Sequence, residues 1–142
     1  MAASPAPVTA EEIALVTNTL NTVMIAMDTG DGNLFASCFT EDGACEIPLT
    51  KAPNPTQGTE ALVALGAELH AKFPKAKHWE GNICIRRANR GEGGVKKDVL
   101  RNTSYWKAME GVEVVSTGEH DDILINVNGE WKIEYRIISH LW

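Results

Sequence analysis

The segment EHDDILINVNGEWKIEYRIIS, residues 119–139, decides the fold that we expect for this chain. Apolar and polar residues alternate on both sides of Asn128-Gly129, and Asn-Gly is a typical dipeptide of two-residue β-hairpin turns. The same period of two begins after Lys77 and is interrupted by glycines within 91–94 and by Glu110-Gly111. The pattern predicts strands at 78–88, 95–109, 112–127 and 130–141, connected as an antiparallel meander.

Before the meander, apolar residues recur at helical spacing. Thr9 and Glu12 have the form of a capping box, and the apolar stripe of the helix that they open ends at Met27. Asp28 follows that stripe by one position, just before the helix-breaking segment Gly30-Asp31-Gly32. The sequence therefore predicts a long N-terminal helix that ends close to Asp28.

Shorter elements lie between this helix and the meander. Residues 33–39 predict a second helix, 44–49 a short strand, and the prolines of 51–58 a loop. Thr59 is expected to cap a third helix, which Pro74 ends. Helices followed by an antiparallel meander are typical of the α+β class. We expect a cone-shaped barrel, in which three N-terminal helices close a curved, mostly antiparallel sheet and the mouth admits a small apolar molecule.

Length and charge restrict the class of protein. The 142 residues suit one domain, which we place at 9–142 behind an Ala/Pro-rich leader, residues 1–8, expected to be disordered. A net charge of -6 and a pI near 5.2 argue against general electrostatic binding to nucleic acid or to anionic membranes. Three cysteines without CxxC spacing suit reduced thiols in a cytoplasmic protein better than disulfides or a zinc site.

Asp28 and His78 are the most informative polar residues. Each lies where an apolar element meets a polar break, so a compact fold could bring both to one apolar pocket. A neutral imidazole takes up a proton near pH 7, and a carboxylate at its other nitrogen fixes the tautomer and stabilises the imidazolium. If Asp28 and His78 meet, the sequence predicts an enzyme in which His78 is the base. In the alternative, Asp28 caps the following turn and His78 is a hydrogen-bonded strand residue.

Several motifs, taken in order, resemble one family. They are Asp28-Thr-Gly-Asp31, Gly58-Thr-Glu-Ala-Leu62, His78-Trp-Glu-Gly-Asn82, and Gly118-Glu-His-Asp-Asp122 with the strand that contains Arg136. Their order and spacing resemble the SnoaL-like branch of the nuclear transport factor 2-like superfamily over nearly the whole chain after Val8. Scytalone dehydratase, bile-acid dehydratase and hexachlorocyclohexane dehydrochlorinase look most similar. The resemblance implies that Asp28 and His78 remove a proton from carbon and drive elimination.

Other side chains are candidates for contacts with a substrate. Asn82 shares the His78 face of an extended strand, unless a β-bulge at Gly81 changes the alternation. The resemblance implies that the strand face with Arg101 and Tyr105 points inward. The full set of substrate-binding candidates is Met24, Asn82, Arg101, Tyr105, His120 and His140.

His120 and Arg101 each have a second interpretation. The resemblance places His120 inside the cone, where it would donate to a substrate oxygen or act as a second acid, and the alternative is a hydrogen-bonded core histidine. An inward Arg101 needs an anionic ligand or an acidic partner such as Glu46 or Asp121. The alternative is a solvated or dimer-facing arginine.

These expectations favour a cofactor-independent lyase of the dehydratase type, or an isomerase or cyclase, acting on a small apolar oxygenated compound such as a polyketide or terpenoid. The alternative is a non-catalytic ligand-binding or assembly module of the same fold. A weaker alternative is an epoxide hydrolase, which would place Arg101 between Asp28 and Asp121. The four histidines lack HxH and HExxH spacing, so no metal is expected.

The outer face of the meander predicts self-association. It is rich in Val, Ile and Trp, so we expect a homodimer or homotrimer that forms through the sheet. Light scattering that finds only a 15.5 kDa species would contradict this expectation. The expected partners are thus a small-molecule substrate and further copies of the chain, with no nucleic acid and no membrane.

Overall fold

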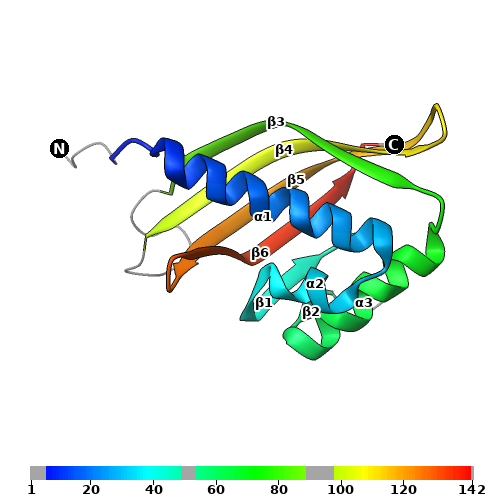
Figure 1. The fold of residues 1–142 in the computed structure, drawn as a ribbon, viewed down its shortest axis with the longest axis horizontal. Helices are drawn as coiled ribbons and strands as arrows, with labels where there is room; N and C mark the ends of the chain where they lie inside the picture. Colours follow the sequence, from blue (N-terminus) through cyan, green and yellow to red (C-terminus); the bar gives the residue numbers. More distant parts are fainter. Residues whose placement is uncertain (1–5, 49–53, 89–97, 142) are drawn as a thin grey trace.

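The structure of the protein is a computed structural model that describes residues 6–48, 54–88 and 98–141 (Figure 1). Within these residues the elements follow one another as α1 (Ala10–Thr29), α2 (Gly32–Ser37), β1 (Phe39–Glu46), β2 (Thr56–Gln57), α3 (Thr59–Lys72), β3 (Lys77–Arg87), β4 (Val99–Glu110), β5 (Glu113–Val127) and β6 (Glu130–His140). This order confirms the α+β class and the meander predicted from the hairpin signals.

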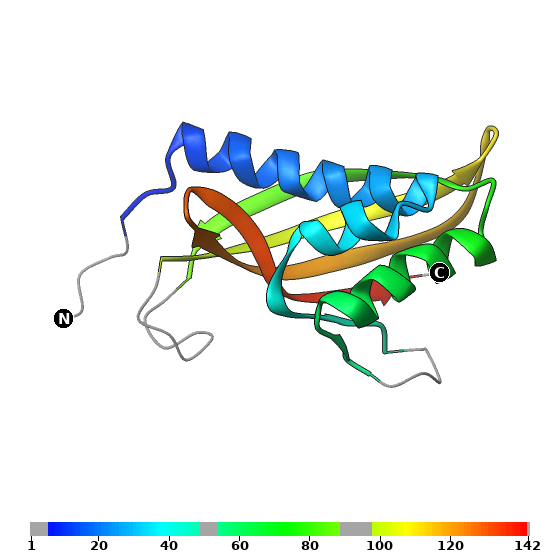
Figure 2. The same cartoon turned by 60° about the horizontal axis from the view of Figure 1, so that its bottom comes forward.

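The strands form one curved sheet with the order β2-β1-β6-β5-β4-β3. The β1–β6 pair is parallel and the other pairs are antiparallel. The sheet is unclosed, since β2 and β3 are its edges, and the helices cover one of its faces (Figure 2). α1 lies along this face against β3 and β6, while α2 and α3 pack together beside β1. Helices rather than strand pairing therefore complete the enclosure.

The core fills the space between α1 and the sheet. Val16 and Leu20 of α1 are fully buried with Leu100, Leu124 and Ile133 of the sheet. Removing this apolar stripe from water stabilises the docking of α1 on the sheet. Because the helix is held along its length, its last turn has a fixed position above the start of β3.

Local signals at both ends determine the length of α1. The Thr9 hydroxyl accepts a hydrogen bond from the N–H of Glu12, and the Glu12 carboxylate accepts one from the N–H of Thr9, so the predicted capping box is confirmed. At the other end Gly30 has φ 74°, a left-handed conformation that suits glycine and ends the helix. Asp31 then caps α2 by accepting from the N–H of Leu34. Asp28 therefore lies in the last turn of α1.

Some local expectations are wrong. Gly58, not Thr59, is the N-cap of α3, and the Thr59 hydroxyl donates to the carbonyl of Glu41 instead. β1 begins at Phe39 rather than at residue 44, and it continues through the polar residues 40–43 with a shift of register against β6 between Phe39 and Ala44. Within the predicted loop, the short strand β2 pairs with β1.

Part of the predicted leader has defined contacts. The Arg87 guanidinium donates to the carbonyl of Ala6 at 3.2 Å and to that of Pro7 at 3.1 Å, so residues 6–8 are held beside β3. Residues 1–5 of the leader, and the parts of the predicted strands, loop and turns at 49–53 and 89–97, lie outside the described residues. Among the helices that the structure describes, none is long and apolar enough to cross a membrane.

Candidate functional site

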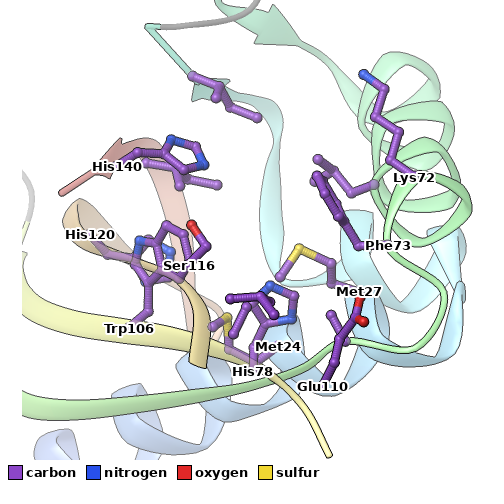
Figure 3. A pocket seen from close by; sticks show the side chains of 16 residues that line it. Met24, Met27, Lys72, Phe73, His78, Trp106, Glu110, Ser116, His120 and His140 are labelled. Atoms are coloured by element: carbon purple, nitrogen blue, oxygen red, sulfur yellow. The ribbon is translucent and has the colours of Figure 1, made fainter. Parts of the chain in front are cut away.

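A cavity of about 490 Å³ lies between the sheet and the helices (Figure 3). Its size is in the range of small-molecule sites. In Figure 3 His140, His120 and Trp106 lie on one side of the cavity, and Lys72 at the end of α3 and the following Phe73 lie on the opposite side. Much of the wall is apolar, and its polar side chains are Lys72, His78, Glu110, Ser116, His120 and His140.

The structure brings Asp28 and His78 together at this cavity. Nδ1 of His78 lies 2.6 Å from Oδ1 of Asp28, and the backbone N–H of His78 donates to Oδ2 at 2.9 Å. The side chain of Asp28 is 6% exposed and that of His78 is 13% exposed. An ionised carboxylate only accepts hydrogen bonds, so a neutral imidazole in this contact carries its proton on Nδ1. This leaves the lone pair on Nε2 for a ligand.

The edge position of β3 explains this two-point contact. An edge strand has backbone N–H groups without a strand partner, and the backbone N–H of His78 donates to the carboxylate of Asp28. Lys77, the first residue of β3, donates from its ammonium group to the backbone carbonyl of Asp28 at 3.3 Å. The end of α1 is thus tied to the start of β3 by one side-chain pair and by hydrogen bonds to the backbone.

A second histidine–carboxylate pair borders the same cavity. Nδ1 of His120 lies 3.0 Å from Oε1 of Glu80, and both side chains are almost completely buried. The Ser104 hydroxyl also donates to Oε1 of Glu80, and Nη2 of Arg136 lies 3.8 Å from the same atom. Glu80 comes two residues after His78 on β3, so both side chains point to the inner face.

A buried ion pair supports Glu80 from behind. The Arg136 guanidinium donates to both carboxylate oxygens of Asp122, at 2.6 and 3.0 Å. The Asn102 amide bridges this pair to Glu80, since it donates to Asp122 at 3.0 Å and to the Ser104 hydroxyl at 2.9 Å. Burial would lower the pKa of Arg136, but the carboxylates of Asp122 and Glu80 outweigh it and raise that pKa. Arg136 is therefore a permanent buried cation.

This cation shapes the titration of the second pair. Burial would raise the pKa of Glu80, but the hydrogen bond from His120 and the charge of Arg136 lower it overall. For His120, burial and the charge of Arg136 lower the pKa, and they outweigh the carboxylates of Glu80 and Asp122. At neutral pH the pair is therefore an ionised Glu80 beside a neutral His120. Burial also lowers the pKa of His140.

Trp106 separates the two pairs. Its ring centroid lies 6.0 Å from that of His78 and 6.0 Å from that of His120, and 5.2 Å from His140, which meets it edge-on. Nε1 of Trp106 is buried and has no hydrogen-bond partner among the described residues. A Cβ at Gly118 would lie 2.4 Å from the indole ring and 2.0 Å from the carbonyl oxygen of Ser139. The absence of a side chain at Gly118 therefore makes room for Trp106.

Gly118→Ala is expected to destabilise the protein by about 1–3 kcal/mol and to move Trp106, because the new methyl group has no space. Urea unfolding measures the first effect, and the near-UV circular dichroism of the tryptophans the second. Gly81→Ala is the matched control, since no atom lies within 4 Å of a Cβ there. Equal stability of the two variants would contradict this description of the cavity wall.

Acidification is expected to lower the free energy of unfolding. The folded pKa of His120 lies below the ordinary value of 6.5, so the unfolded chain binds this proton at a higher pH than the folded protein does. The contribution of His120 is complete above pH 6.5 and is lost as the pH falls through the folded pKa; Glu80, whose pKa is also lowered, acts in the same direction below 4.5. Urea unfolding at several pH values should show a smaller loss in His120→Phe than in wild type. Identical pH dependence would contradict the assignment.

The structure places the predicted substrate-binding residues in two groups. Met24, His120 and His140 line the cavity, as does His78. Asn82 does not, because a β-bulge follows Gly81 and Asn82 takes φ 52° with an exposed side chain. The expectation that Asn82 shares the inner face with His78 is therefore wrong. Beyond the bulge, the inner face of β3 carries the partly buried Ile83 and Ile85.

Arg101 and Tyr105 also lie outside the cavity. In β3–β4 pairing His78 is opposite Ala108 and Glu80 is opposite Trp106, so the inner face of β4 is the one with Trp106 and Ala108. The resemblance implied that the face with Arg101 and Tyr105 points inward, and this expectation is wrong. Tyr105 is 52% exposed, and Arg101 donates to both carboxylate oxygens of Asp121 at 3.0 Å on the outer face. The Asp-Arg-Asp arrangement of Arg101 with Asp28 and Asp121, which the epoxide hydrolase alternative would need, does not form.

Glu80 and Trp106 were missed by reasoning from the sequence. The alternation of β3 put Glu80 on the face of His78, but nothing in the sequence showed that His120 lies beside it. Trp106 belongs to the hydrophobic core and also lines the cavity. Among the described residues, no group of three or more His, Cys, Asp or Glu side chains is placed to hold a metal ion. Cys38 and Cys45 are buried, and burial raises the pKa of their thiols to about 11 and about 12, respectively.

Comparison with known proteins agrees with this architecture. Residues 8–137 match the family model described as the SnoaL-like domain. The structure of Rv3472, a protein of unknown function from Mycobacterium tuberculosis, is 26% identical with a TM-score of 0.74, and the match covers 91% of this chain and 71% of that one. No curated protein matches the chain.

Other solved structures show the same fold at lower identity. A protein from Catenulispora acidiphila, in complex with S-DNPA, has 22% identity and a TM-score of 0.73, with 93% of this chain and 95% of that chain covered. A nuclear transport factor 2-like protein with a cystatin-like fold from Novosphingobium aromaticivorans has 14% identity and a TM-score of 0.76, with 92% and 82% covered. The predicted nuclear transport factor 2-like fold is confirmed.

Proposed function

The chain belongs to the SnoaL-like domain family, and on this premise we propose that it is a cofactor-independent acid–base enzyme. The reaction is a lyase reaction of the dehydratase type, or an isomerisation or cyclisation, of a small apolar oxygenated compound such as a polyketide or terpenoid. One observation carries the proposal: the Asp28–His78 pair, 2.6 Å apart, borders an apolar cavity of about 490 Å³.

The chemistry follows from the two contacts of Asp28. The carboxylate holds the imidazole of His78 by Nδ1 and by the backbone N–H, which orients Nε2 as a base. Nε2 takes a proton from a carbon next to a carbonyl group, the electron pair of that C–H bond moves into an enolate, and Asp28 stabilises the imidazolium. The imidazolium then returns the proton to a leaving hydroxyl, to another carbon, or to the alkoxide formed on ring closure.

The cavity wall suits such a step. Apolar side chains, among them Met24, Met27 and Ile138, exclude water from the reacting atoms and strengthen the electrostatic interactions of the two carboxylate–histidine pairs. The complex of the Catenulispora acidiphila protein with S-DNPA supports the use of this fold to bind a ligand.

Proton exchange tests the proposal without knowledge of the physiological substrate. Each of the three reactions begins with removal of a carbon-bound proton, so the wild-type protein in D₂O should exchange an acidic C–H of at least one compound in a panel of cyclic and aryl ketones. NMR of the ketone measures the rate. The alternative function, a ligand-binding module, predicts that compounds bind in the cavity with no exchange above the buffer rate. That result would overturn the proposal.

A further inference from the structure

We propose that Glu80 is a positioning residue that fixes His120 as a hydrogen-bond acceptor, so that the substrate of this cavity carries a hydroxyl group, a phenol or an enol, facing His120. The inference rests on the proposed function, because it names the substrate class of the same site. It assigns to His120 the role opposite to the donor or acid role that its position first suggested.

The geometry of the pair determines which nitrogen holds the proton. Glu80 receives hydrogen bonds on Oε1 from the Ser104 hydroxyl and from Nδ1 of His120, the latter at 3.0 Å. An ionised carboxylate has no proton to donate, so the proton of the pair lies on Nδ1 of His120. Nε2 then carries a lone pair. His120 lines the cavity, and Nε2 has no hydrogen bond to any described residue, so the lone pair is available to a ligand.

The buried cation keeps Glu80 in the ionised form. Nη2 of Arg136 lies 3.8 Å from Oε1, and the same guanidinium is held by Asp122 behind it. These charges lower the pKa of Glu80 overall, and burial with the charge of Arg136 lowers the pKa of His120. The cluster of one cation and two carboxylates therefore favours a neutral imidazole in one tautomer.

Packing prevents His120 from adopting the other orientation. The imidazole is 1% exposed and stacks on Trp106 with an interplanar angle of 24°. A ring flip would break the bond to Glu80 and leave a buried carboxylate with one partner fewer, which is unfavourable. The wall of the cavity thus presents one acceptor at a defined place.

The acceptor selects a ligand by its proton. A substrate hydroxyl donates to Nε2 of His120, while the acidic C–H of the same molecule lies at His78 on the other side of Trp106. An ether or methyl group at this place leaves the lone pair unsatisfied.

Binding of two isosteric probes tests the inference. Wild-type protein should bind 2-naphthol about tenfold or more tightly than 2-methylnaphthalene, because only the first donates a hydrogen bond. His120→Phe should bring the ratio of the two dissociation constants close to one. His70→Phe is the matched control, since His70 is a histidine of α3 that does not line the cavity, and it should keep the preference. No preference in wild type, or an unchanged preference in His120→Phe, would overturn the inference.

The tautomer provides a readout that a structural role would not move. At pH 7 the long-range proton–nitrogen NMR spectrum of wild type should show His120 with Nδ1 protonated and Nε2 bare. Glu80→Gln removes the charge that raises the pKa of His120, so that pKa should fall further, while Glu119→Gln on the neighbouring position of β5 should leave it unchanged. A protonated Nε2 in wild type overturns the inference without any variant.

The two proposals fail separately. Proton exchange with ketones depends on Asp28 and His78, whereas the preference for 2-naphthol depends on His120 and Glu80. Exchange without the naphthol preference would leave the acid–base function standing and overturn the substrate class. The naphthol preference without exchange would support a hydroxyl-binding site in a protein that is not an enzyme.

Discussion

Asp28→Asn and His78→Ala are each expected to reduce protein-catalysed proton exchange by about 10²–10⁴-fold, the usual contribution of a positioned general base. His78→Ala removes the base itself. Asp28→Asn keeps an oxygen that accepts from the backbone N–H of His78, but its amide group faces Nδ1 and favours the tautomer with the proton on Nε2. That tautomer has no lone pair to offer to the substrate. Exchange rates measured by NMR in D₂O give the size of the loss.

The comparison needs a control that leaves the fold intact. Asp121→Asn changes the same chemical group in the outer pair with Arg101, and it should exchange like the wild type. Circular dichroism and ligand binding verify that Asp28→Asn and His78→Ala are folded. If either folded variant exchanges as fast as wild type, His78 is not the base or Asp28 does not orient it.

Arg136→Met is expected to lower the free energy of unfolding by about 3–5 kcal/mol, because it leaves a carboxylate pair buried without its cation. Arg136 is 1% exposed, and its partners Asp122 and Glu80 have no exposed side-chain surface. The guanidinium donates two hydrogen bonds to Asp122 that methionine cannot replace. Urea unfolding followed by tryptophan fluorescence measures the loss.

Arg101→Met is the matched control, since Arg101 pairs with Asp121 on the outer face with side chains 26% and 37% exposed. It should lower the stability by only about 0–1 kcal/mol, as is typical of exposed ion pairs. Adding Asp122→Leu to Arg136→Met should recover part of the loss by removing one of the two carboxylates. Equal effects of Arg136→Met and Arg101→Met would show that the buried cluster is not the stabilising element described here.

The sequence predicted the features that depend on local signals. The capping box of Thr9, the helix end at Gly30 and the turn at Asn128-Gly129 are each encoded by a few adjacent residues, and the structure has all of them. Asp28 and His78 come together because each lies at the end of an element whose position the core determines. The sequence suggested this meeting through the positions of the two residues and through the resemblance to the SnoaL-like branch, and the structure shows the contact.

Features that depend on register stayed open at the level of sequence, where a bulge at Gly81 was only one of two alternatives for β3. The bulge after Gly81 reverses which residues of β3 face inward, so Asn82 lies outside while Ile83 and Ile85 are inward. On β6, the register against both neighbouring strands shifts between Ile133 and Arg136. Simple alternation would put these two residues on opposite faces, yet both are buried. Alternation within one strand cannot show where such a shift occurs.

The second pair is a further example. Glu80 and His120 belong to strands that are not adjacent in the sheet, and β4 lies between them. Their contact depends on the pairing of Glu80 with Trp106 and of Trp106 with Gly118, together with the space that Gly118 provides. Glu80, Asp122 and Arg136 come from three different strands, and only the three-dimensional register shows that they form one buried cluster.

The most direct test of the account is a crystal structure of the wild-type protein with a ketone that it exchanges in D₂O. The account predicts that the exchanging carbon lies within about 3–3.5 Å of Nε2 of His78, the distance of a reactive arrangement, with Asp28 still bound to Nδ1. A ligand seated outside the cavity, or one whose acidic carbon lies away from His78, would contradict it.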